Sequence, residues 1–179
     1  KLASISFDAM DLDKQLALLR VLAVTFVRLG APSEVERMKC LDWFEPKYPQ
    51  AQPAPHPSPL PKERKPDAGT KKFLPLPAGE GRGERENSHV QHLNWELCRL
   101  LVYLNSPTVI EKTLPLIKEA TASEDLLFYP FMLRYVKDGW TLEARRVCFE
   151  ALNRAEKLNG ASTYFKAIAD TRSELAAAL

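Results

Sequence analysis

A proline-rich segment in the middle of the chain constrains the fold more than any other feature. Residues 45–87 hold 10 of the 14 prolines and 4 of the 7 glycines of this 179-residue chain. Proline fixes φ and lacks a backbone donor, so neither a helix nor a central strand can run through such a stretch. We therefore expect 45–87 to be a disordered Pro/Gly-rich insertion between two folded segments, 1–44 and 88–179.

Three interpretations of this insertion are open. It can act as a spacer, or as a proline-rich ligand for an aromatic groove on another protein. The third interpretation concerns the origin of the insertion and rests on residues 58–61, which contain Leu-Pro, and residues 76–84, which contain Gly-Glu. Codons for Gly-Glu read as Leu-Pro on the complementary strand, so an inverted DNA repeat would produce both. On that hypothesis the insertion has no chemical role, and the gene should contain a long hairpin.

Charge is balanced on both sides of the insertion. Residues 1–44 carry 6 basic and 6 acidic side chains, and residues 88–179 carry 11 of each. The formal net charge of +2 therefore lies within the insertion. A nucleic-acid-binding domain needs concentrated positive charge, so we expect no nucleic-acid partner. No apolar run reaches the roughly 18 residues of a membrane span, and three cysteines do not make a disulfide scaffold.

Apolar residues in both flanking segments recur with the helical period near 3.6. The pattern predicts about seven helices, which begin near residues 12, 33, 90, 107, 123, 141 and 162. In the first, Val21 and Val24 lie opposite the main stripe, which predicts burial on more than one face. Ser33 and Glu36 match a capping box, and Ser106 suits an N-cap. Pro115 and Pro130 are expected to disturb the helices that contain them.

Short connections between these helices favour antiparallel neighbours, and apolar stripes on two sides favour stacking. We therefore expect an all-α fold of HEAT-like stacked antiparallel helix pairs, an α-solenoid fragment. Residues 1–44 would form the first helical hairpin, and residues 88–179 would form the HEAT-like repeats. The hairpin period fits the range of about 40–47 residues known for HEAT and armadillo repeats. A compact helical bundle is the alternative.

Two stretches carry a resemblance to a known class of proteins: residues 93–109, LNWELCRLLVYLNSPTV, and residues 135–141, YVKDGWT. They resemble the HEAT-like region of large multidomain bacterial proteins of planctomycete type. In those proteins this region joins a β-propeller similar to sugar dehydrogenases to a C-terminal c-type cytochrome domain. The resemblance covers 88–179, and 11–44 more loosely, and implies a periplasmic or secreted location. This chain contains neither propeller repeats nor a C-x-x-C-H haem motif.

Few residues suggest chemistry, and each also has a structural interpretation. His89 and His92 offer two nitrogens at helical spacing, but zinc needs about four ligands, so we assign no metal site. The three cysteines lie at apolar stripes, as buried cysteines do, and Trp140 is predicted to be a packing anchor. Charged residues considered for catalysis or anion binding are instead predicted to form ion pairs between adjacent units. The cysteines are Cys40, Cys98 and Cys148, and the charged residues are Glu96, Arg99, Arg134, Arg145 and Arg146.

The function expected from these observations is a non-catalytic scaffold or spacer, without cofactor, that presents a helical surface. Its partner would be another protein or a neighbouring domain, because the chain opens on Lys1 and reads as part of a longer or processed protein. The alternative is an accessory region of a secreted dehydrogenase and c-type cytochrome redox protein. A third interpretation is a small helical enzyme that uses His89, His92 and Cys98.

Overall fold

The computed structural model describes the backbone of residues 6–50 and 81–178, and the side chains of residues 6–50 and 88–177. Within these ranges the chain is entirely helical, with seven α-helices and no strand, which confirms the predicted all-α class. The disorder predicted for the insertion concerns residues 51–80, which lie outside the described residues. The helices are α1 (Leu12–Leu29), α2 (Glu34–Phe44), α3 (Gly81–Tyr103), α4 (Val109–Glu119), α5 (Ser123–Leu133), α6 (Leu142–Glu156) and α7 (Ser162–Ala178), with short 3-10 helices η2 (Phe7–Ala9) and η3 (Glu45–Lys47).

Helix α2 begins as its local sequence predicts. The Ser33 hydroxyl accepts from the Glu36 amide, and the Glu36 carboxylate accepts from the Ser33 amide at 3.0 Å, so the capping box is confirmed. Gly30 ends α1 with a φ of +88°, a conformation that a residue with a Cβ adopts only under strain. Together these residues turn the chain sharply between α1 and α2.

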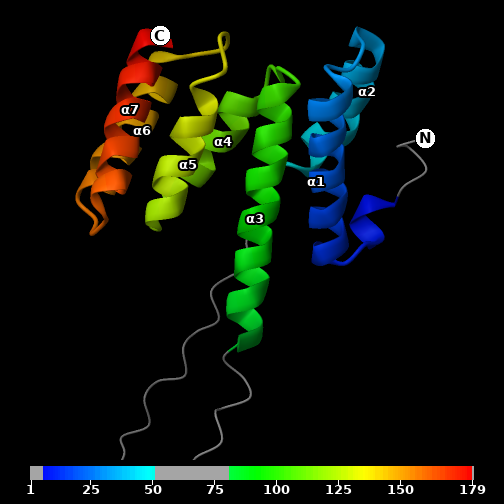
Figure 1. Ribbon diagram of the computed structural model, residues 1–179, viewed down its shortest axis with the longest axis horizontal. Coiled ribbons are helices and arrows are strands. Elements are labelled where there is room, and N and C mark those ends of the chain that lie inside the picture. The colour runs from blue at the N-terminus through cyan, green and yellow to red at the C-terminus, as the bar shows by residue number, and fades with distance from the viewer. Residues whose placement is uncertain (1–5, 51–80, 179) are drawn as a thin grey trace, which may run out of the picture.

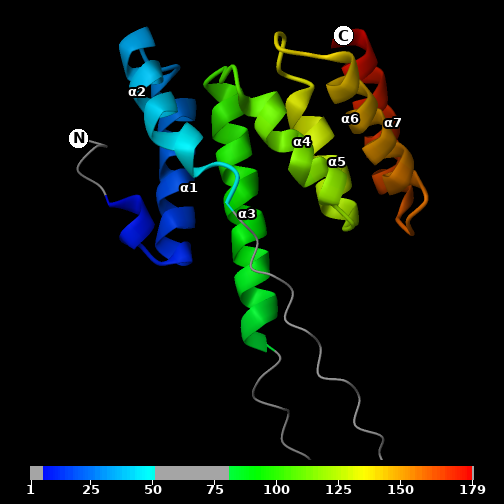
Figure 2. The same cartoon turned by 180° about the vertical axis from the view of Figure 1, so that it is seen from behind.

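The α-helices form two layers, and most of them contact the helix two positions along the chain (Figure 1). In one layer α1 contacts α3, α3 contacts α5, and α5 contacts α7; in the other, α4 contacts α6. Seen from behind, the same order runs from α1 and α2 at one end to α6 and α7 at the other (Figure 2). Neighbouring hairpins therefore stack along a line.

Helices α1 and α3 run parallel, as alternate helices of stacked hairpins must. Three contacts advance in the same direction along both helices, from near the start of α1 to the end of α3. The His89 Nε2 lies 3.7 Å from Asp13 Oδ1, Arg20 donates to Glu96 at 3.5 Å, and the Phe26 and Tyr103 rings stack with centroids 5.6 Å apart. This interface joins the segments on either side of the insertion.

A single core runs through all the stacked hairpins, from Phe7 before α1 to Leu175 in α7. The segments before and after the insertion therefore fold as one unit rather than as separate domains. The largest fully buried side chains come from both segments: Phe7, Leu19, Phe44, Leu93, Leu97, Leu101, Leu104, Ile117, Leu133, Leu152, Ile168 and Leu175.

Residues 45–50 depart from the prediction that the insertion begins at residue 45. They form η3 and then pack into the core, where Tyr48 is 3% exposed. The Tyr48 hydroxyl is hydrogen-bonded to Thr113 Oγ1 in α4 at 2.8 Å. Asn94 of α3 accepts from the Gln50 amide at 2.7 Å and donates to the Gln50 carbonyl at 3.1 Å. A buried aromatic ring and a paired backbone therefore hold this stretch against α3 and α4, despite its two prolines. At its other end, the segment predicted as insertion is helical from Gly81, where α3 begins.

Three proline and capping signals act differently from the predictions. Pro115 and Pro130 lie inside α4 and α5, which are continuous through them. Ser106 is not the N-cap of α4, which is Thr108, but its hydroxyl accepts from the Thr108 amide at 3.3 Å. The same hydroxyl donates to the Glu45 carboxylate of η3 at 2.5 Å. Ser106 therefore combines a local contact before α4 with a tertiary contact to η3.

Candidate functional site

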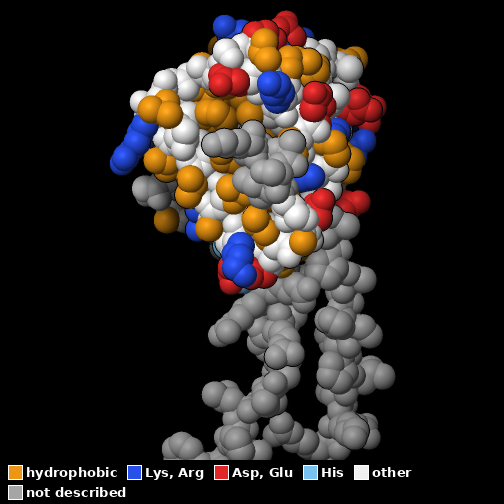
Figure 3. Space-filling view, turned by 90° about the vertical axis from the view of Figure 1, so that its right-hand side faces the viewer, with side chains coloured by type: hydrophobic (Ala, Val, Ile, Leu, Met, Phe, Trp, Pro, Cys, Tyr) orange, Lys and Arg blue, Asp and Glu red, His pale blue; other side chains and the backbone are white. Residues whose placement is uncertain are grey.

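The outer face of α1, at the first end of the stack, is rich in exposed apolar side chains. Val21, Val24 and Val27 are 62%, 51% and 80% exposed, and Val35 and Met38 of α2, at the same end of the stack, are also exposed. Figure 3 views this end and shows hydrophobic side chains spread across it between scattered charges. The prediction that α1 is buried on more than one face is therefore wrong for this chain, because α3 covers one face and leaves the other exposed.

Helix α7, at the other end, is different in character. Its exposed positions are mainly small or polar, with Phe165 at 39% as the large apolar exception. Solenoids end in helices with polar outer faces, which keep the terminal unit soluble. By that criterion α7 resembles a terminal helix and α1 resembles an internal one. The exposed small or polar residues of α7 are Ser162, Thr163, Lys166, Ala169, Asp170, Ser173, Glu174, Ala176 and Ala177.

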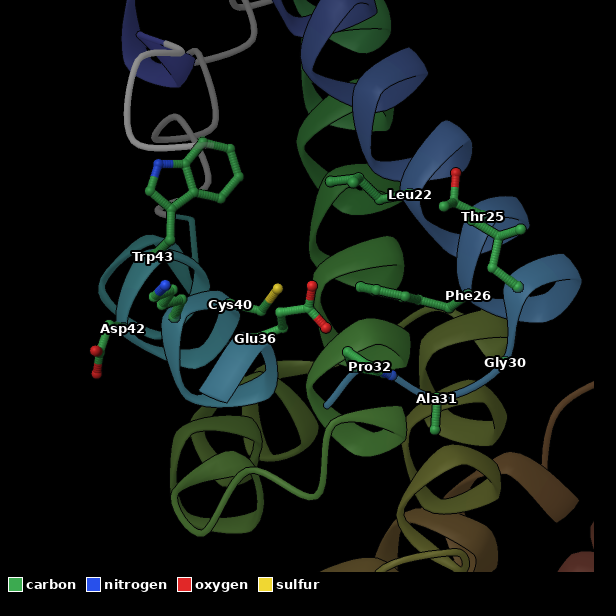
Figure 4. Close-up of a pocket in the computed structure, with 12 residues that line it drawn as sticks. Leu22, Thr25, Phe26, Gly30, Ala31, Pro32, Glu36, Cys40, Asp42 and Trp43 are labelled. Atoms are coloured by element: carbon green, nitrogen blue, oxygen red, sulfur yellow. The ribbon is translucent and has the colours of Figure 1, made fainter. Parts of the chain in front are cut away.

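A groove of about 830 Å³ separates α1 from α2 (Figure 4). Leu22 and Phe26 of α1 point across it toward α2, while Cys40 and Glu36 of α2 point toward α1. The turn from Gly30 to Pro32 closes one end of the groove. Its lining is mainly apolar, and the two helices diverge above that turn, so the groove is open to side chains from outside.

A second, shallower hollow of about 450 Å³ lies on the outer side of α1. Val21, Val24 and Leu29 form its apolar part, and Arg20 and Arg28 border it. Arg20 reaches back to Glu96 of α3, at a long 3.5 Å. Among the residues that the structure describes, Arg28 forms no ion pair. The hollow is therefore apolar in the middle and positively charged at its borders.

The predicted candidate histidines lie on α3 but do not converge on a common centre. His89 is near Asp13 of α1, whereas the His92 ring packs edge-on against Trp95, with centroids 5.2 Å apart. Within residues 6–50 and 88–177, no group of three or more ligating side chains surrounds a possible metal position. The structure therefore does not bring a third ligand to this pair.

All three cysteines are buried and unbonded to one another, as the apolar pattern predicts. Burial raises the pKa of Cys98 to about 11 and that of Cys148 to about 12, so both thiols stay protonated near neutral pH. Burial, followed by the charge of Glu36, also raises the pKa of Cys40, which borders the groove.

Two of the predicted charged residues connect alternate helices of the stack. Glu96 meets Arg20 of α1, and Arg134 lies 3.0 Å from Glu174 of α7. Arg99 and Arg146 form ion pairs within their own helices, with Glu96 at 2.8 Å and Glu150 at 2.7 Å. These pairs contribute modestly to stability because at least one partner is solvent-exposed.

Arg145 and Trp140 take structural positions. In the described part of the chain, the buried Nε of Arg145 has no hydrogen-bond partner. Trp140 is half-buried against the core and donates its indole N–H to the Val136 carbonyl at 2.8 Å. The expectation that Trp140 anchors packing agrees with this contact.

One polar cluster was not among the candidates from the sequence. Asp125 of α5 is 8% exposed and accepts from the Trp95 indole at 2.7 Å and from the Gln91 amide at 2.8 Å. The Trp95 ring also stacks on Phe128 of α5, with centroids 4.9 Å apart. Burial raises the pKa of Asp125, although both hydrogen bonds oppose this shift. The cluster fixes α5 against α3; the sequence signal for it is one acid in the first turn of an apolar helix.

No protein-family model, curated protein or solved structure matches this chain. Among the helices of the described residues, none combines the length and the apolar character that crossing a membrane requires.

Proposed function

We propose that this chain is a non-catalytic helical-repeat scaffold of HEAT-like type, which holds another protein or a neighbouring domain at its α1 and α2 end. The observation that carries the proposal is the difference between the two ends of the stack. Exposed apolar residues are concentrated on α1 and α2, whereas α7 has a mainly polar outer face. Large apolar side chains exposed together at one end of a molecule mark an interaction site.

The rest of the stack supports a presenting role. Alternate helices pack in series around one core, so the position of α1 is fixed by α3 and, through α3, by the later hairpins. Solenoid repeats display extended surfaces in this manner. The groove between α1 and α2 adds depth to the surface, because it accepts apolar side chains between two helices.

Site-specific photo-crosslinking in the cells that produce the protein tests the proposal. A benzophenone amino acid is placed at the exposed Val27 of α1, and in a matched variant at the exposed Lys166 of α7. We expect Val27 to crosslink reproducibly to one polypeptide, or to one further region of a longer chain, and Lys166 not to do so. Equal labelling from both positions, or none from Val27, would contradict a binding role for the α1 end.

A further inference from the structure

The outer face of α1 has the spacing of a helix-packing seam. Ala17, Val21, Val24 and Arg28 follow one another at intervals of four, three and four residues, so they lie along one side of the helix. All four are exposed. A second helix laid along this side would cover a continuous strip, with small apolar residues in the middle.

Positive charge surrounds the middle and the end of this seam. Arg20 and Arg28 border the hollow around Val21 and Val24. Asp13 and Lys14 lie one to two turns before Arg20, where Lys14 is paired with Asp11 at 2.6 Å and Asp13 lies near His89. Between Arg20 and the end of α1, the charged side chains along the seam are both positive, Arg20 and Arg28. Acidic side chains on a partner helix would be attracted to it, and basic ones would be repelled.

The interface on the other side of α1 already uses this chemistry. There α3 lies parallel to α1 and places the Glu96 carboxylate beside Arg20, within a packing surface of leucines and aromatic rings. The seam on the outer face continues this interface in the same stacking direction. A helix that combined apolar residues with flanking carboxylates would therefore repeat the α1–α3 contact.

A second copy of this chain fits the seam less well. In a two-fold pair of antiparallel α1 helices centred on the middle of the seam, Val21 would face Val24, and Ala17 of each copy would face Arg28 of the other. A second copy would therefore bring no carboxylate to Arg28. A helix with carboxylates beside its apolar stripe gains this charge contact, so the seam favours an unlike partner.

We infer that the outer face of α1 docks an amphipathic helix of another protein, or of another domain, whose apolar stripe is flanked by acidic residues. The inference rests on the proposed scaffold function and adds the chemistry of the partner. Val21 and Val24 provide the apolar contact. Arg28, which has no ion pair among the described residues, selects for carboxylates, and Arg20, which lies 3.5 Å from Glu96, adds positive charge beside it.

Binding of two synthetic helical peptides to the full chain tests this inference. Both peptides have the length of α1 and a stripe of leucines at heptad spacing; one is flanked by glutamates and the other by lysines. Fluorescence anisotropy measures both affinities with the unsubstituted chain and with Arg28→Glu, Val24→Glu and Lys137→Glu. Lys137 is an exposed lysine between α5 and α6, so its variant is the control for charge reversal away from the seam.

We expect the acidic peptide to bind at least about tenfold more tightly than the basic one. Arg28→Glu and Val24→Glu should each weaken its binding about tenfold or more, while Lys137→Glu leaves it within about twofold. Unfolding curves establish that each variant is folded. Light scattering that showed a dimer dissociated by Val24→Glu would overturn the inference in favour of a second copy.

Equal affinity for both peptides, or no binding by the acidic one, would also overturn the inference. If both peptides bind equally and Val24→Glu weakens both, the acidic partner is wrong and the scaffold function stands. If neither peptide binds and Val27 forms no crosslink, both the inference and the scaffold function fail.

Discussion

The Arg154 guanidinium of α6 lies against the end of α4, where its Nη2 donates to the Ile117 carbonyl at 2.6 Å. Its Nη1 donates to the carbonyls of Lys118 at 3.3 Å and Ala120 at 3.1 Å. The last carbonyls of a helix lack partners within that helix and carry its negative dipole end. One side chain thus satisfies the end of α4 and joins the last two hairpins. Lys112 of α4 has a similar role, since its ammonium donates to the Glu45 carbonyl after α2.

Arg154→Ala is expected to destabilise the fold by about 1–3 kcal/mol, because hydrogen bonds to a charged group are lost at a helix end. Urea unfolding followed by circular dichroism measures the change. The matched control is Arg146→Ala on the same helix, which loses only an exposed pair with Glu150 and should destabilise the fold much less than Arg154→Ala does. Equal effects of the two substitutions would show that Arg154 does not join α4 to α6.

Tyr48→Ala is expected to destabilise the fold by about 3–5 kcal/mol, because it removes a buried ring from the core. Tyr48→Phe keeps the ring and loses the bond to Thr113, so it should cost about 0.5–1.5 kcal/mol. Denaturant titration of the full chain gives both values. A negligible effect of Tyr48→Ala would mean that residues 45–50 do not belong to the core.

The stability of the chain should depend on the ionisation of Asp125. Since burial raises its pKa, the folded state keeps the proton at pH values where the unfolded carboxyl, with an ordinary pKa of 3.8, has lost it. Stability from this group is therefore greatest at low pH and decreases as pH rises above 3.8. Urea unfolding measured from about pH 3.5 to 7 should show that, as the pH rises, the free energy of unfolding of the native chain falls relative to that of Asp125→Asn.

The neighbouring carboxyl provides a comparison for this pH effect. Glu124 is exposed and its charge contributes, less than burial does, to the raised pKa of Asp125, so Glu124→Gln should reduce the pH dependence less than Asp125→Asn does. A constant difference between Asp125→Asn and the native chain at every pH would contradict a raised pKa for Asp125.

Thiol labelling of the native protein should discriminate among the three cysteines. Burial raises the pKa of all three thiols, but Cys40 is 4% exposed and borders the groove, whereas Cys98 and Cys148 are fully buried. Variants that each retain one cysteine should therefore react with Ellman's reagent fastest at Cys40, because the other two thiols need local or global opening. In denaturant all three should react alike. Faster native labelling of Cys98 than of Cys40 would contradict the groove between α1 and α2.

Local chemistry made much of the fold predictable. Gly30 and the Ser33–Glu36 box specify the turn between the first two helices by contacts within a few residues. Tyr48 was missed because its partner Thr113 lies 65 residues away, and no short pattern records that contact. Its neighbours Pro46 and Pro49 favoured an extended segment, and burial of the ring overrode them.

The candidate surface was partly visible in the sequence. The valines of α1 made that helix apolar on two sides, which is typical of a helix with neighbours on both. The sequence could not indicate which side the rest of this chain covers, because that depends on the direction in which α3 stacks. The polar cluster around Asp125 was hidden for a similar reason, since Trp95 and Gln91 reach it from a different helix.

The unlike faces of α1 and α7 also limit how copies of this protein can polymerise. Head-to-tail fibres form when opposite faces of a subunit are mutually complementary, because each added subunit then presents the same free binding face to the next. The exposed side of α7 offers the valine seam no stripe of large apolar residues, because Phe165 is the one exposed large apolar side chain among its described residues. Addition of an apolar helix at the first end would therefore terminate growth, and the assembly would have a defined length and a single polarity.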